Sequence, residues 1–440
     1  MQAHELLPAI QHALELASEK TLRLDQRWNP ADGAPVITVA GRYMARSWTQ
    51  WTQGFQYGNA LLCFELTGEQ ELLTTATKHV LHDMAEHLTH TGVHDHGFNN
   101  ISTYGNLRRM MLEGRIPTNE WELNFCELAL KVSGAVQAAR WTSIQDGLGY
   151  IYSFNGAQSL FIDTIRTLRI CCLAHSLGHT LQGEQDKKIS LLDRALAHAE
   201  TSARYNVYYG EGRDSYDLPE LRGRTVHEAL FNPGSGVFRA PSSQQGFSPF
   251  TTWTRGLAWG MLGFTELMEF LPEPPEFLAR AARATCDFYL QHASASDGIC
   301  YWDTGAPQLY RLSDWQSRPA DPYNDYEPVD ASASAIAAQG LLRLGHILGK
   351  SGEAYTQAGL TIAERLLQAP YLSLQPDHEG LLLHSIYHRP NGWDYIPPGA
   401  KVPCGESSMW GDYHLLELCL LISRMANSGY YTFFGAQHAG

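Results

Sequence analysis

The spacing of apolar residues constrains the fold of this chain more than any other feature of its sequence. These residues recur every three or four positions in roughly twelve segments, which is the periodicity of amphipathic helices. No linker rich in Pro, Gly and Ser separates the segments. We therefore expect one all-α domain over residues 1–440, an (α/α)6 barrel with an inner and an outer ring of helices. The expected helices cover 3–20, 49–66, 70–91, 99–114, 120–138, 157–180, 187–208, 251–270, 274–293, 330–348, 351–368 and 408–426.

Between the expected helices lie stretches with other patterns. Residues 226–241 alternate apolar and polar side chains around an Asn-Pro-Gly turn, which predicts a β-hairpin. The segments 298–305 and 380–390 show a similar strand-like pattern. Two long segments, 206–224 and 303–329, have no regular periodicity and are rich in Gly, Pro, Asp, Tyr and Arg. We expect them to form functional loops.

Composition narrows the classes of ligand. Hydrophobic residues make up 44% of the chain and charged residues only 18%, against about 25% in typical proteins, so a large core can form. The net charge of −14 repels phosphate backbones, and we expect no nucleic-acid partner. The chain has 11 Trp, 21 Tyr and 16 Phe, whose flat faces and polar edges suit sugar rings.

The sequence also indicates a cellular location. Its first twenty residues alternate polar and apolar types and lack the features of a signal peptide. No run of about 18 apolar residues occurs, so we expect no membrane association. The eight cysteines lack paired CxxC spacing and predict buried, reduced thiols. We expect a cytoplasmic protein, either a monomer or a homodimer.

One cluster of histidines has the spacing of a metal site. Leu73, Val80 and Leu88 lie on the opposite face of the same expected helix, however, so the cluster predicts a solvated polar face. The motifs GxGxxG, HExxH and GxSxG and the P-loop pattern are also absent. We expect neither a metal nor an organic cofactor. The cluster consists of His79, His82, Glu86 and His90.

Two aspartates have unusual neighbours. Asp163 lies in an apolar segment, where a carboxylate must be paired, protonated or exposed in a pocket. It is either an acid whose pKa is raised by burial, or a structural carboxylate paired with Arg166 or Arg169. Asp95 lies between two histidines and just before Gly-Phe. It is either a site residue or only the N-cap of the following helix.

The motif WTRGLAW (253–259) places Arg255 and Trp259 on one face of a helix. Trp offers a stacking surface, and Arg offers a planar set of donors that matches a carboxylate. The alternative is a core Trp beside a structural Arg. A second aromatic cluster, at the start of another expected helix, on its own predicts core packing: Trp48, Trp51 and Phe55.

Six motifs, in order along most of the chain, resemble those of one family, the unsaturated glucuronyl hydrolases (glycoside hydrolase family 88). WTQGF (51–55) resembles the family's W-T-D-G-F, and HDHGF (94–98) resembles its H-D-x-G-F. FIDTIRTL (161–168) is similar to the apolar helix that bears the family's catalytic Asp. The other matches are His227, Gln245, WTRGLAW (253–259), DASASAI (330–336) and GESSMWGDYHLLE (405–417).

The resemblance implies an (α/α)6 barrel that acts on the unsaturated oligosaccharides made by polysaccharide lyases. Such enzymes hydrate the C4–C5 vinyl ether of the terminal uronic acid, and the resulting hemiketal opens and expels the neighbouring sugar. The resemblance makes Asp163 the acid and base, Asp95 its assistant, and Arg255 the partner of the uronate carboxylate. It implies no metal or organic cofactor, because the vinyl ether is already activated toward acid. It implies substrate contacts from His94, Trp51, Phe55, His227, Gln245, Arg255 and Trp259.

Three alternatives remain open. A sister family, the unsaturated rhamnogalacturonyl hydrolases, usually has Asn-Gly where this chain has Leu257-Ala258. An epimerase on the same barrel would work through paired histidines, like the N-acylglucosamine epimerases. A carbohydrate-binding protein without catalysis would bind the same oligosaccharides unchanged. The segment 210–223 looks longer than in typical family members, and we expect it to affect the choice of leaving sugar.

Overall fold

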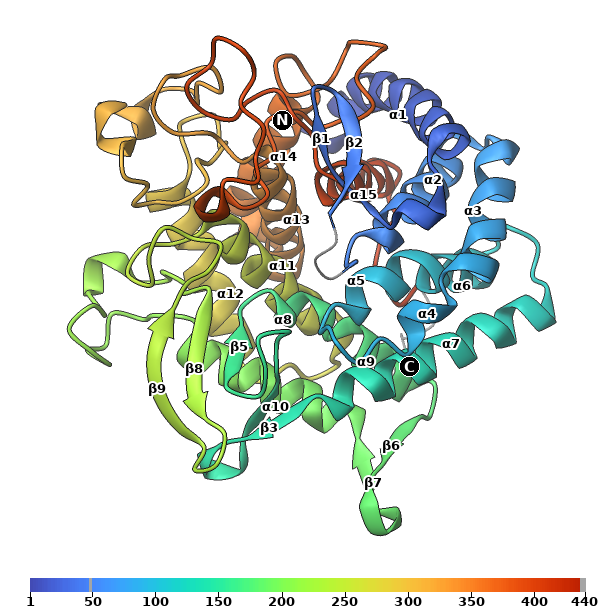
Figure 1. Ribbon diagram of the computed structural model, residues 1–440, viewed down its shortest axis with the longest axis vertical. Coiled ribbons are helices and arrows are strands. Elements are labelled where there is room, and N and C mark those ends of the chain that lie inside the picture. The colour runs from blue at the N-terminus through green and yellow to red at the C-terminus, as the bar shows by residue number, and fades with distance from the viewer. Residues whose placement is uncertain (47–49, 436–440) are drawn as a thin grey trace.

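Six helical segments form a closed inner ring in the part of the chain that the computed structural model describes, residues 1–46 and 50–435 (Figure 1). Each segment contacts the next, and the last contacts the first. The start of the helix expected over 49–66, and Trp48 before it, lie outside the described residues. The ring consists of α2 (Gln53–Thr67), α5 (His96–Asn100) with α6 (Asn106–Leu112), α8 (Thr164–Thr167) with α9 (Arg169–Ser176), α11 (Thr254–Phe270), α13 (Ala331–Leu348) and α15 (Met409–Ala426).

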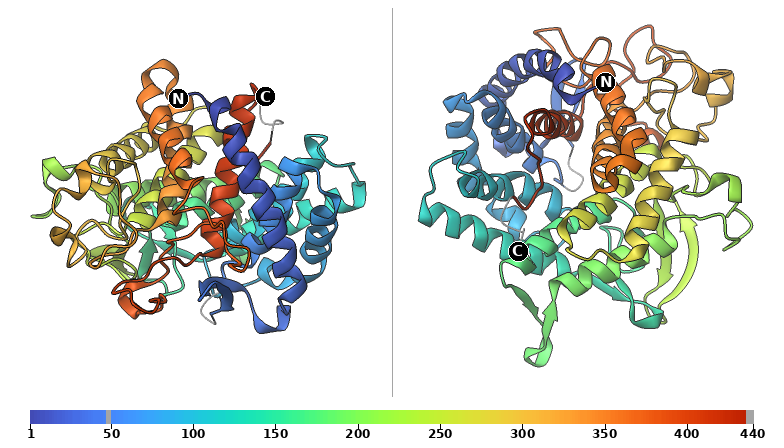
Figure 2. Two further views of the ribbon diagram at one scale, coloured as in Figure 1. Left: turned by 90° about the horizontal axis from the view of Figure 1, so that it is seen from above. Right: turned by 180° about the vertical axis from the view of Figure 1, so that it is seen from behind.

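An outer layer of helices covers this ring (Figure 2). The layer consists of α1 (Leu7–Arg27) against α2 and α15, α3 (Gln70–Asp83) against α2, α4 (Ala85–Leu88) and α7 (Glu120–Ala139) against α5, α10 (Leu191–Tyr205) against α9, α12 (Glu276–Phe288) against α11, and α14 (Glu353–Leu366) against α13. The predicted (α/α)6 barrel is confirmed. Among the described helices, none combines the length and the apolar character needed to cross a bilayer.

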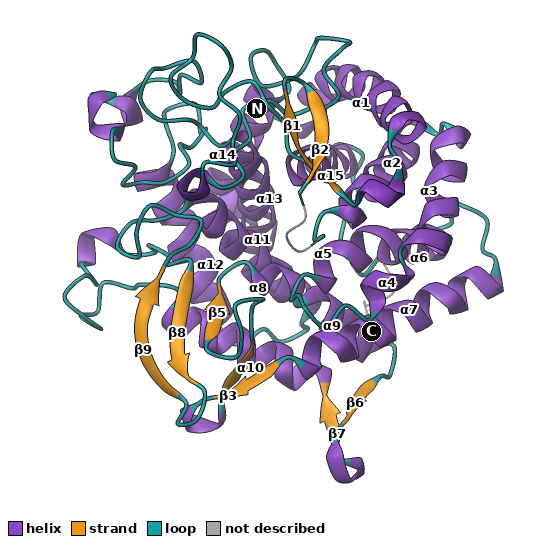
Figure 3. Cartoon of the chain, in the orientation of Figure 1, coloured by secondary structure: helices purple, strands orange, loops and turns teal. Residues whose placement is uncertain are grey.

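Short antiparallel strands fill the loops between helices (Figure 3). The predicted hairpin over 226–241 is confirmed as β8 (Glu228–Asn232) and β9 (Val237–Ser242), and β5 (Ser159–Phe161) pairs with β8. The other pairs are β1 (Pro35–Val39) with β2 (Arg42–Ala45), β3 (Trp141–Ser143) with β4 (Gly149–Ile151), and β6 (Thr180–Gln182) with β7 (Lys188–Ser190).

The structure corrects three sequence-based predictions. The helix expected over 187–208 begins only at Leu191, because residues 188–190 form β7 and pair with β6. The helix expected over 157–180 is wrong in its first part, because residues 159–161 pair with β8 and an apolar run of that length fits a buried strand equally well. The strand-like segments 298–305 and 380–390 form only isolated bridges in the described chain. The segments 206–224 and 303–329 are irregular, as predicted.

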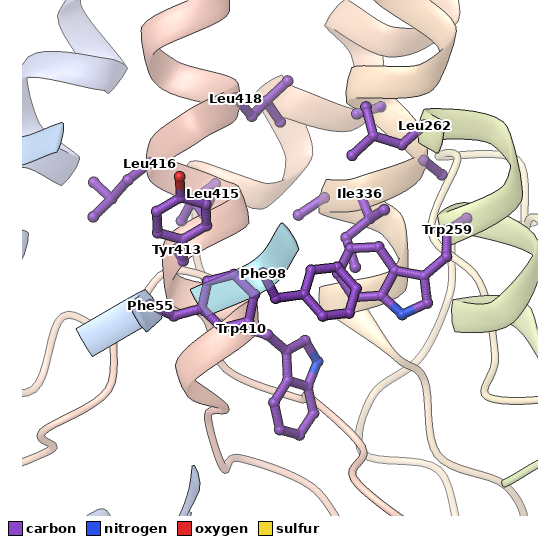
Figure 4. Packing of buried hydrophobic residues seen from close by; sticks show 14 of the residues in the cluster. Phe55, Phe98, Trp259, Leu262, Ile336, Trp410, Tyr413, Leu415, Leu416 and Leu418 are labelled. Carbon is purple, nitrogen blue, oxygen red and sulfur yellow. The ribbon is translucent and has the colours of Figure 1, made fainter. Parts of the chain in front are cut away.

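Aromatic side chains fill the middle of the barrel (Figure 4). Phe98 packs against Trp259 with ring centroids 4.7 Å apart, and Phe55 packs against Tyr413 at 4.9 Å. Trp410 stacks on Trp51 at 4.9 Å. The layer therefore connects α2, α5, α11 and α15 across the ring, and the residues that precede these helices lie around it.

Two motif glycines bring the inner helices into backbone contact. A Cβ atom at Gly97 would lie 2.1 Å from the carbonyl oxygen of Thr167, and one at Gly54 would lie 2.3 Å from that of Asn99. No larger residue fits these crossings without a shift of backbone. The glycines of HDHGF and WTQGF thus fix how closely α2, α5 and α8 approach.

Buried ion pairs lie deeper in the barrel. Arg166 contacts Glu266 at 2.7 Å and Glu417 at 2.9 Å, and all three side chains are almost fully buried. The hydroxyl of Tyr431, in the segment after α15, donates to Glu417 at 2.9 Å. The C-terminal segment thereby contacts the charged interior of the ring.

We predict that Gly97→Ala lowers the free energy of unfolding by about 1–3 kcal/mol, because the added methyl group overpacks the contact with α8. Gly234→Ala is the matched control, since a Cβ there meets its nearest atom at an ordinary 3.4 Å. Denaturant unfolding of both variants measures the difference. Equal stability of the two variants would contradict the close crossing.

Candidate active site

A cleft lies where the inner helices begin. It encloses about 500 Å3 of space free of protein atoms, part of it open to solvent. Its walls bring together seven of the nine site residues expected from the sequence: Trp51, His94, Asp95, Asp163, Gln245, Arg255 and Trp259. Because helix N-termini carry partial positive charge, the start of so many helices at one cleft favours an anionic ligand.

His94 joins the two aspartates at the centre of this cleft. Its Nε2 lies 3.1 Å from Oδ1 of Asp163 and 3.8 Å from Oδ1 of Asp95. Both carboxyl groups therefore face the same imidazole nitrogen. Asp95 and Asp163 are only 6% and 7% exposed, so their charges interact with little screening by water.

The two structural alternatives for these aspartates are wrong. Asp95 stands at the N-cap position of α5, but its side chain accepts no capping hydrogen bond. Asp163 stands at the start of α8 with His94 as its hydrogen-bond partner, whereas Arg166 pairs with Glu266 and Glu417. Neither carboxyl group is used to hold the fold together by the contacts expected of a structural role.

The electrostatics of the group favour a shared proton. Burial raises the pKa of Asp95 to about 6, the charge of His94 opposes this and the charge of Asp163 adds to it. Burial alone would lower the pKa of His94, but Asp95 and Asp163 raise it above its ordinary value. The cleft can therefore hold a proton on a carboxyl group at a pH where an exposed aspartate is ionised.

His227 lies behind the cleft wall in a fixed tautomer. Its Nδ1 accepts hydrogen bonds from the backbone N–H groups of Gln244 and Gln245, at 3.1 and 3.3 Å. Burial lowers its pKa to about 4, so the ring is neutral and carries its proton on Nε2. Within the described chain that Nε2 has no partner, although it is buried. His227 thus keeps one N–H donor available.

Arg255 is enclosed by the protein. It lies between the rings of Trp253 and Trp410, at 4.7 and 4.9 Å. One terminal nitrogen donates to Asp330 at 3.0 Å and to the carbonyl of residue 386. The other donates to the carbonyl of residue 387 at 2.8 Å and to Oε1 of Gln245 at 2.9 Å. All of its terminal N–H groups donate to protein acceptors, so the guanidinium group faces the protein and not the cleft.

Gln245 receives its orientation from this arginine. Because its Oε1 accepts from Arg255, its amide NH2 group points away from the arginine, and it has no partner among the described residues. The side chain lines the cleft and is only partly buried. Arg255 therefore presents an amide donor to the cleft through Gln245.

The aromatic site residues form two layers. Trp51 and Trp259 line the cleft itself. Phe55 lies one layer deeper, fully buried against Trp51 at 5.9 Å, and supports that ring. The structure thus separates Phe55 and His227 from the direct walls of the cleft.

Other lining residues were missed by the sequence-based predictions. Phe98 and Trp253 belong to the quoted motifs, but nothing in their type distinguished them from core residues. Tyr387 and His388 lie in a segment that was expected to be a strand. The remaining missed residues, which no sequence signal indicated, are Phe154 and Gln244.

The predicted cluster of His79, His82, Glu86 and His90 extends over α3, α4 and the residues after α4, and its first member has structural contacts. His79 contacts Asp25 at 2.9 Å, hydrogen-bonds Asp83, and stacks on Tyr57 at 4.7 Å. In residues 1–46 and 50–435 no group of three or more metal-ligating side chains converges on one point. The cleft itself is lined by carboxyl, imidazole, amide, guanidinium and aromatic groups.

Comparisons with known proteins give one consistent result. The chain is 27% identical to an unsaturated glucuronyl hydrolase of Bacillus sp. strain GL1, over 96% of this chain and 98% of that protein. It is 26% identical to an unsaturated chondroitin disaccharide hydrolase of Streptococcus pyogenes serotype M1, over 93% and 90%. No family model matches the chain.

Solved structures agree. The crystal structure of the unsaturated glucuronyl hydrolase from Bacillus sp. GL1 superposes with a TM-score of 0.72 and 24% identity, and the match covers 97% of this chain and 99% of that one. The barrel is therefore the fold of those enzymes, and the resemblance found in the sequence motifs is confirmed. The epimerase alternative is not favoured by these relatives.

We predict that Arg255→Ala lowers the free energy of unfolding by about 3–5 kcal/mol, because it leaves the buried carboxylate of Asp330 without its charge partner. Arg255→Lys recovers only part of this loss, since an ammonium group cannot reach four acceptors in one plane. Thermal and denaturant unfolding measure both variants. Arg311→Ala, at a fully exposed arginine, is the control; if Arg255→Ala is as stable as that control, the enclosed geometry is wrong.

Proposed function

We propose a reaction for this chain on the premise that it belongs to the unsaturated glucuronyl hydrolase family. The chain releases a 4,5-unsaturated uronic acid from the non-reducing end of oligosaccharides that polysaccharide lyases produce, and residues 1–440 form one catalytic domain. The observation that carries the proposal is the contact of two buried carboxyl groups, Asp95 and Asp163, with the single Nε2 of His94.

The reaction is a hydration. Asp163 delivers a proton to C4 of the vinyl ether, and the positive charge that develops at C5 is quenched by water. Asp163, now ionised, takes a proton from that water, so the acid is restored as the C5 hydroxyl forms. The product is a hemiketal at C5, in which the bond from C5 to the ring oxygen breaks to give a ketone. This leaves a hemiacetal at C1, which collapses to an aldehyde and releases the neighbouring sugar as its alcohol. Asp95 and His94 keep the shared proton near Asp163 between turnovers.

Neutral donors receive the uronate carboxylate. The amide NH2 group of Gln245 lines the cleft and lacks a partner in the described chain, and the helix N-termini around the cleft add positive potential. The Nε2–H of His227 also lacks a partner but lies behind the cleft wall, so we propose that it supports the bound uronate from there. Arg255 acts on the substrate through Gln245, because its own terminal N–H groups are occupied. Trp51, which is partly exposed, provides a stacking surface for the sugar, and Phe55 supports it. Trp259 borders the cleft but is almost fully buried, so it shapes the floor of the cleft.

The names of the relatives support a substrate class. One relative is named for a chondroitin disaccharide, and the Bacillus enzyme is described as responsible for the degradation of glycosaminoglycan. We assign this chain unsaturated glucuronides derived from glycosaminoglycans as its substrates.

The cysteines support a cytoplasmic location. All eight are free thiols and seven are buried, as is typical of proteins in a reducing compartment.

Incubation with lyase digests of several uronate polysaccharides tests this function. The ultraviolet absorbance of the conjugated double bond should fall with time in at least one digest, because hydration removes the double bond. A binding protein or an epimerase would leave the absorbance unchanged, and that result in every digest would exclude the proposed hydrolase.

We predict that Asp163→Asn abolishes the absorbance change, with a loss of at least about a thousandfold in kcat, because the amide has no acidic proton. The variant should fold, since Asp163 holds no part of the barrel through an ion pair with Arg166. Asp193→Asn, at a surface position in the first turn of α10, is the control and should keep full activity. Turnover by a folded Asp163→Asn near that of the control would remove Asp163 from the mechanism.

We predict that kcat/KM falls as pH rises through about 6, the raised pKa of Asp95, because the site then loses the proton that it shares. Below that pH Asp95 is protonated and the group can supply an acid. In Asp95→Asn the side chain at position 95 can no longer lose a proton. The fall of kcat/KM above about pH 6 should therefore disappear, and the overall rate should be lower. A variant whose profile keeps the wild-type limb would assign that titration to another group.

A further inference from the structure

One loop leaves the cleft and returns to it. Gln245 and Trp253 both line the cleft, and the chain between them forms a loop closed at its base. Gly246 packs so tightly there that a Cβ atom would lie 2.8 Å from Cβ of Trp253. Phe247 is the next residue, so its Cα lies about 3.8 Å from that of Gly246. The loop therefore rises from the wall of the cleft itself.

This loop carries exposed aromatic rings on a fixed backbone. The backbone N–H of Phe247 donates to Oδ2 of buried Asp303 at 2.8 Å. The side chains of Phe247 and Phe250 are nevertheless 48% and 45% exposed. A rigid backbone that holds large apolar rings in water is unfavourable for stability alone and is typical of a binding surface.

The irregular segment 206–224 adds a third ring. Tyr216, which is 48% exposed, stacks on Phe250 with centroids 4.0 Å apart. Buried Arg224 holds both rings in place, since it donates to the carbonyl of Tyr216 at 3.4 Å and to that of Pro249 at 3.2 Å. The carboxylate of Asp217 accepts three backbone hydrogen bonds within the same segment. The segment that looked unusually long in the sequence thus places Tyr216 beside the cleft loop.

We propose that Tyr216, Phe247 and Phe250, here called the aromatic rim, bind sugars of the leaving oligosaccharide. These are the sugars that follow the one linked directly to the unsaturated uronic acid. The proposal rests on the proposed function and extends it: the chain prefers oligosaccharides longer than a disaccharide. Stacked and edge-exposed aromatic rings match the apolar faces of pyranose rings, and hydroxyl groups nearby, such as those of Ser243 and Ser248, match their polar edges.

The position of the aromatic rim next to the cleft favours these sugars as its ligand. Phe247 lies two residues from Gln245 and Phe250 three residues from Trp253, so the Cα atom of each lies within about 11 Å of that of a cleft residue. When the unsaturated end of a substrate is bound in the cleft, the rest of the oligosaccharide must extend outward along one of the cleft walls. Sugars that leave along this loop meet the rim without any change in the protein.

The test compares two substrates with the same unsaturated uronic acid, a disaccharide and a tetrasaccharide, from one lyase digest. In the wild type, kcat/KM should be higher for the tetrasaccharide. Phe250→Ala and Tyr216→Ala should each lower it about tenfold for the tetrasaccharide, which corresponds to 1.4 kcal/mol of binding, and less than about twofold for the disaccharide. The loss should appear in KM, because the rim lies away from the reacting atoms.

Trp121→Ala is the matched control. Trp121 is 65% exposed and stands in the first turn of α7, outside the cleft and its loop, so its removal should change neither substrate. Melting temperatures of all variants should equal that of the wild type, since the rings are exposed. Equal kcat/KM for the two substrates in the wild type, or equal losses on both in the rim variants, would overturn the rim while leaving the hydrolase intact. Failure to consume either substrate would instead overturn the proposed function, and the rim with it.

Discussion

The contact of one buried imidazole with two carboxyl groups is the interaction on which the site depends. His94 and Asp95 precede α5, and Asp163 precedes α8, so the contact requires that these two helices start at the same place. Gly97 allows this, because it lets the backbone of α5 touch that of α8. A barrel with a looser crossing would separate Asp163 from His94 and break this contact.

A second constraint arranges the substrate-binding wall. Arg255 is held between two tryptophan rings, and it ties Asp330 at the start of α13 to the loop before α15. The same guanidinium turns the amide of Gln245 toward the cleft. The arginine thereby orients a neutral donor at the position where the anionic part of a substrate is expected. In the proposed function, a substrate carboxylate would therefore meet this neutral amide and not the guanidinium itself.

Much of the fold could be predicted from the sequence, because helix periodicity is a local property. All twelve expected helical segments contain helix, although their ends shift by several residues. The strand over 159–161 could not be predicted, because it exists only through pairing with a hairpin almost seventy residues away. The two aspartates stood out by their apolar or histidine neighbours, whereas Tyr387 and His388 did not, since only the folded loop brings them to the cleft.

The same limit applies to the role of Arg255. Its type and spacing favour a carboxylate partner, but the sequence gives no sign that Asp330 and two backbone carbonyls occupy its donors. Whether the guanidinium of Arg255 binds protein groups or a substrate depends on distances across the barrel. No short motif encodes these distances. The motifs therefore indicated most of the residues that line one cleft, but not the internal partners of this arginine.

The most direct test of the account is the fate of oxygen during turnover in water enriched in heavy oxygen. Hydration by the Asp163 group places the label at C5 of the former unsaturated uronic acid and leaves its C1 oxygen unlabelled. Mass spectrometry of the uronic acid product, trapped by reduction at early times, measures both positions. Label at C1 of the uronic acid and not at C5 would mean ordinary cleavage of the glycosidic bond, and would contradict the mechanism derived from this cleft.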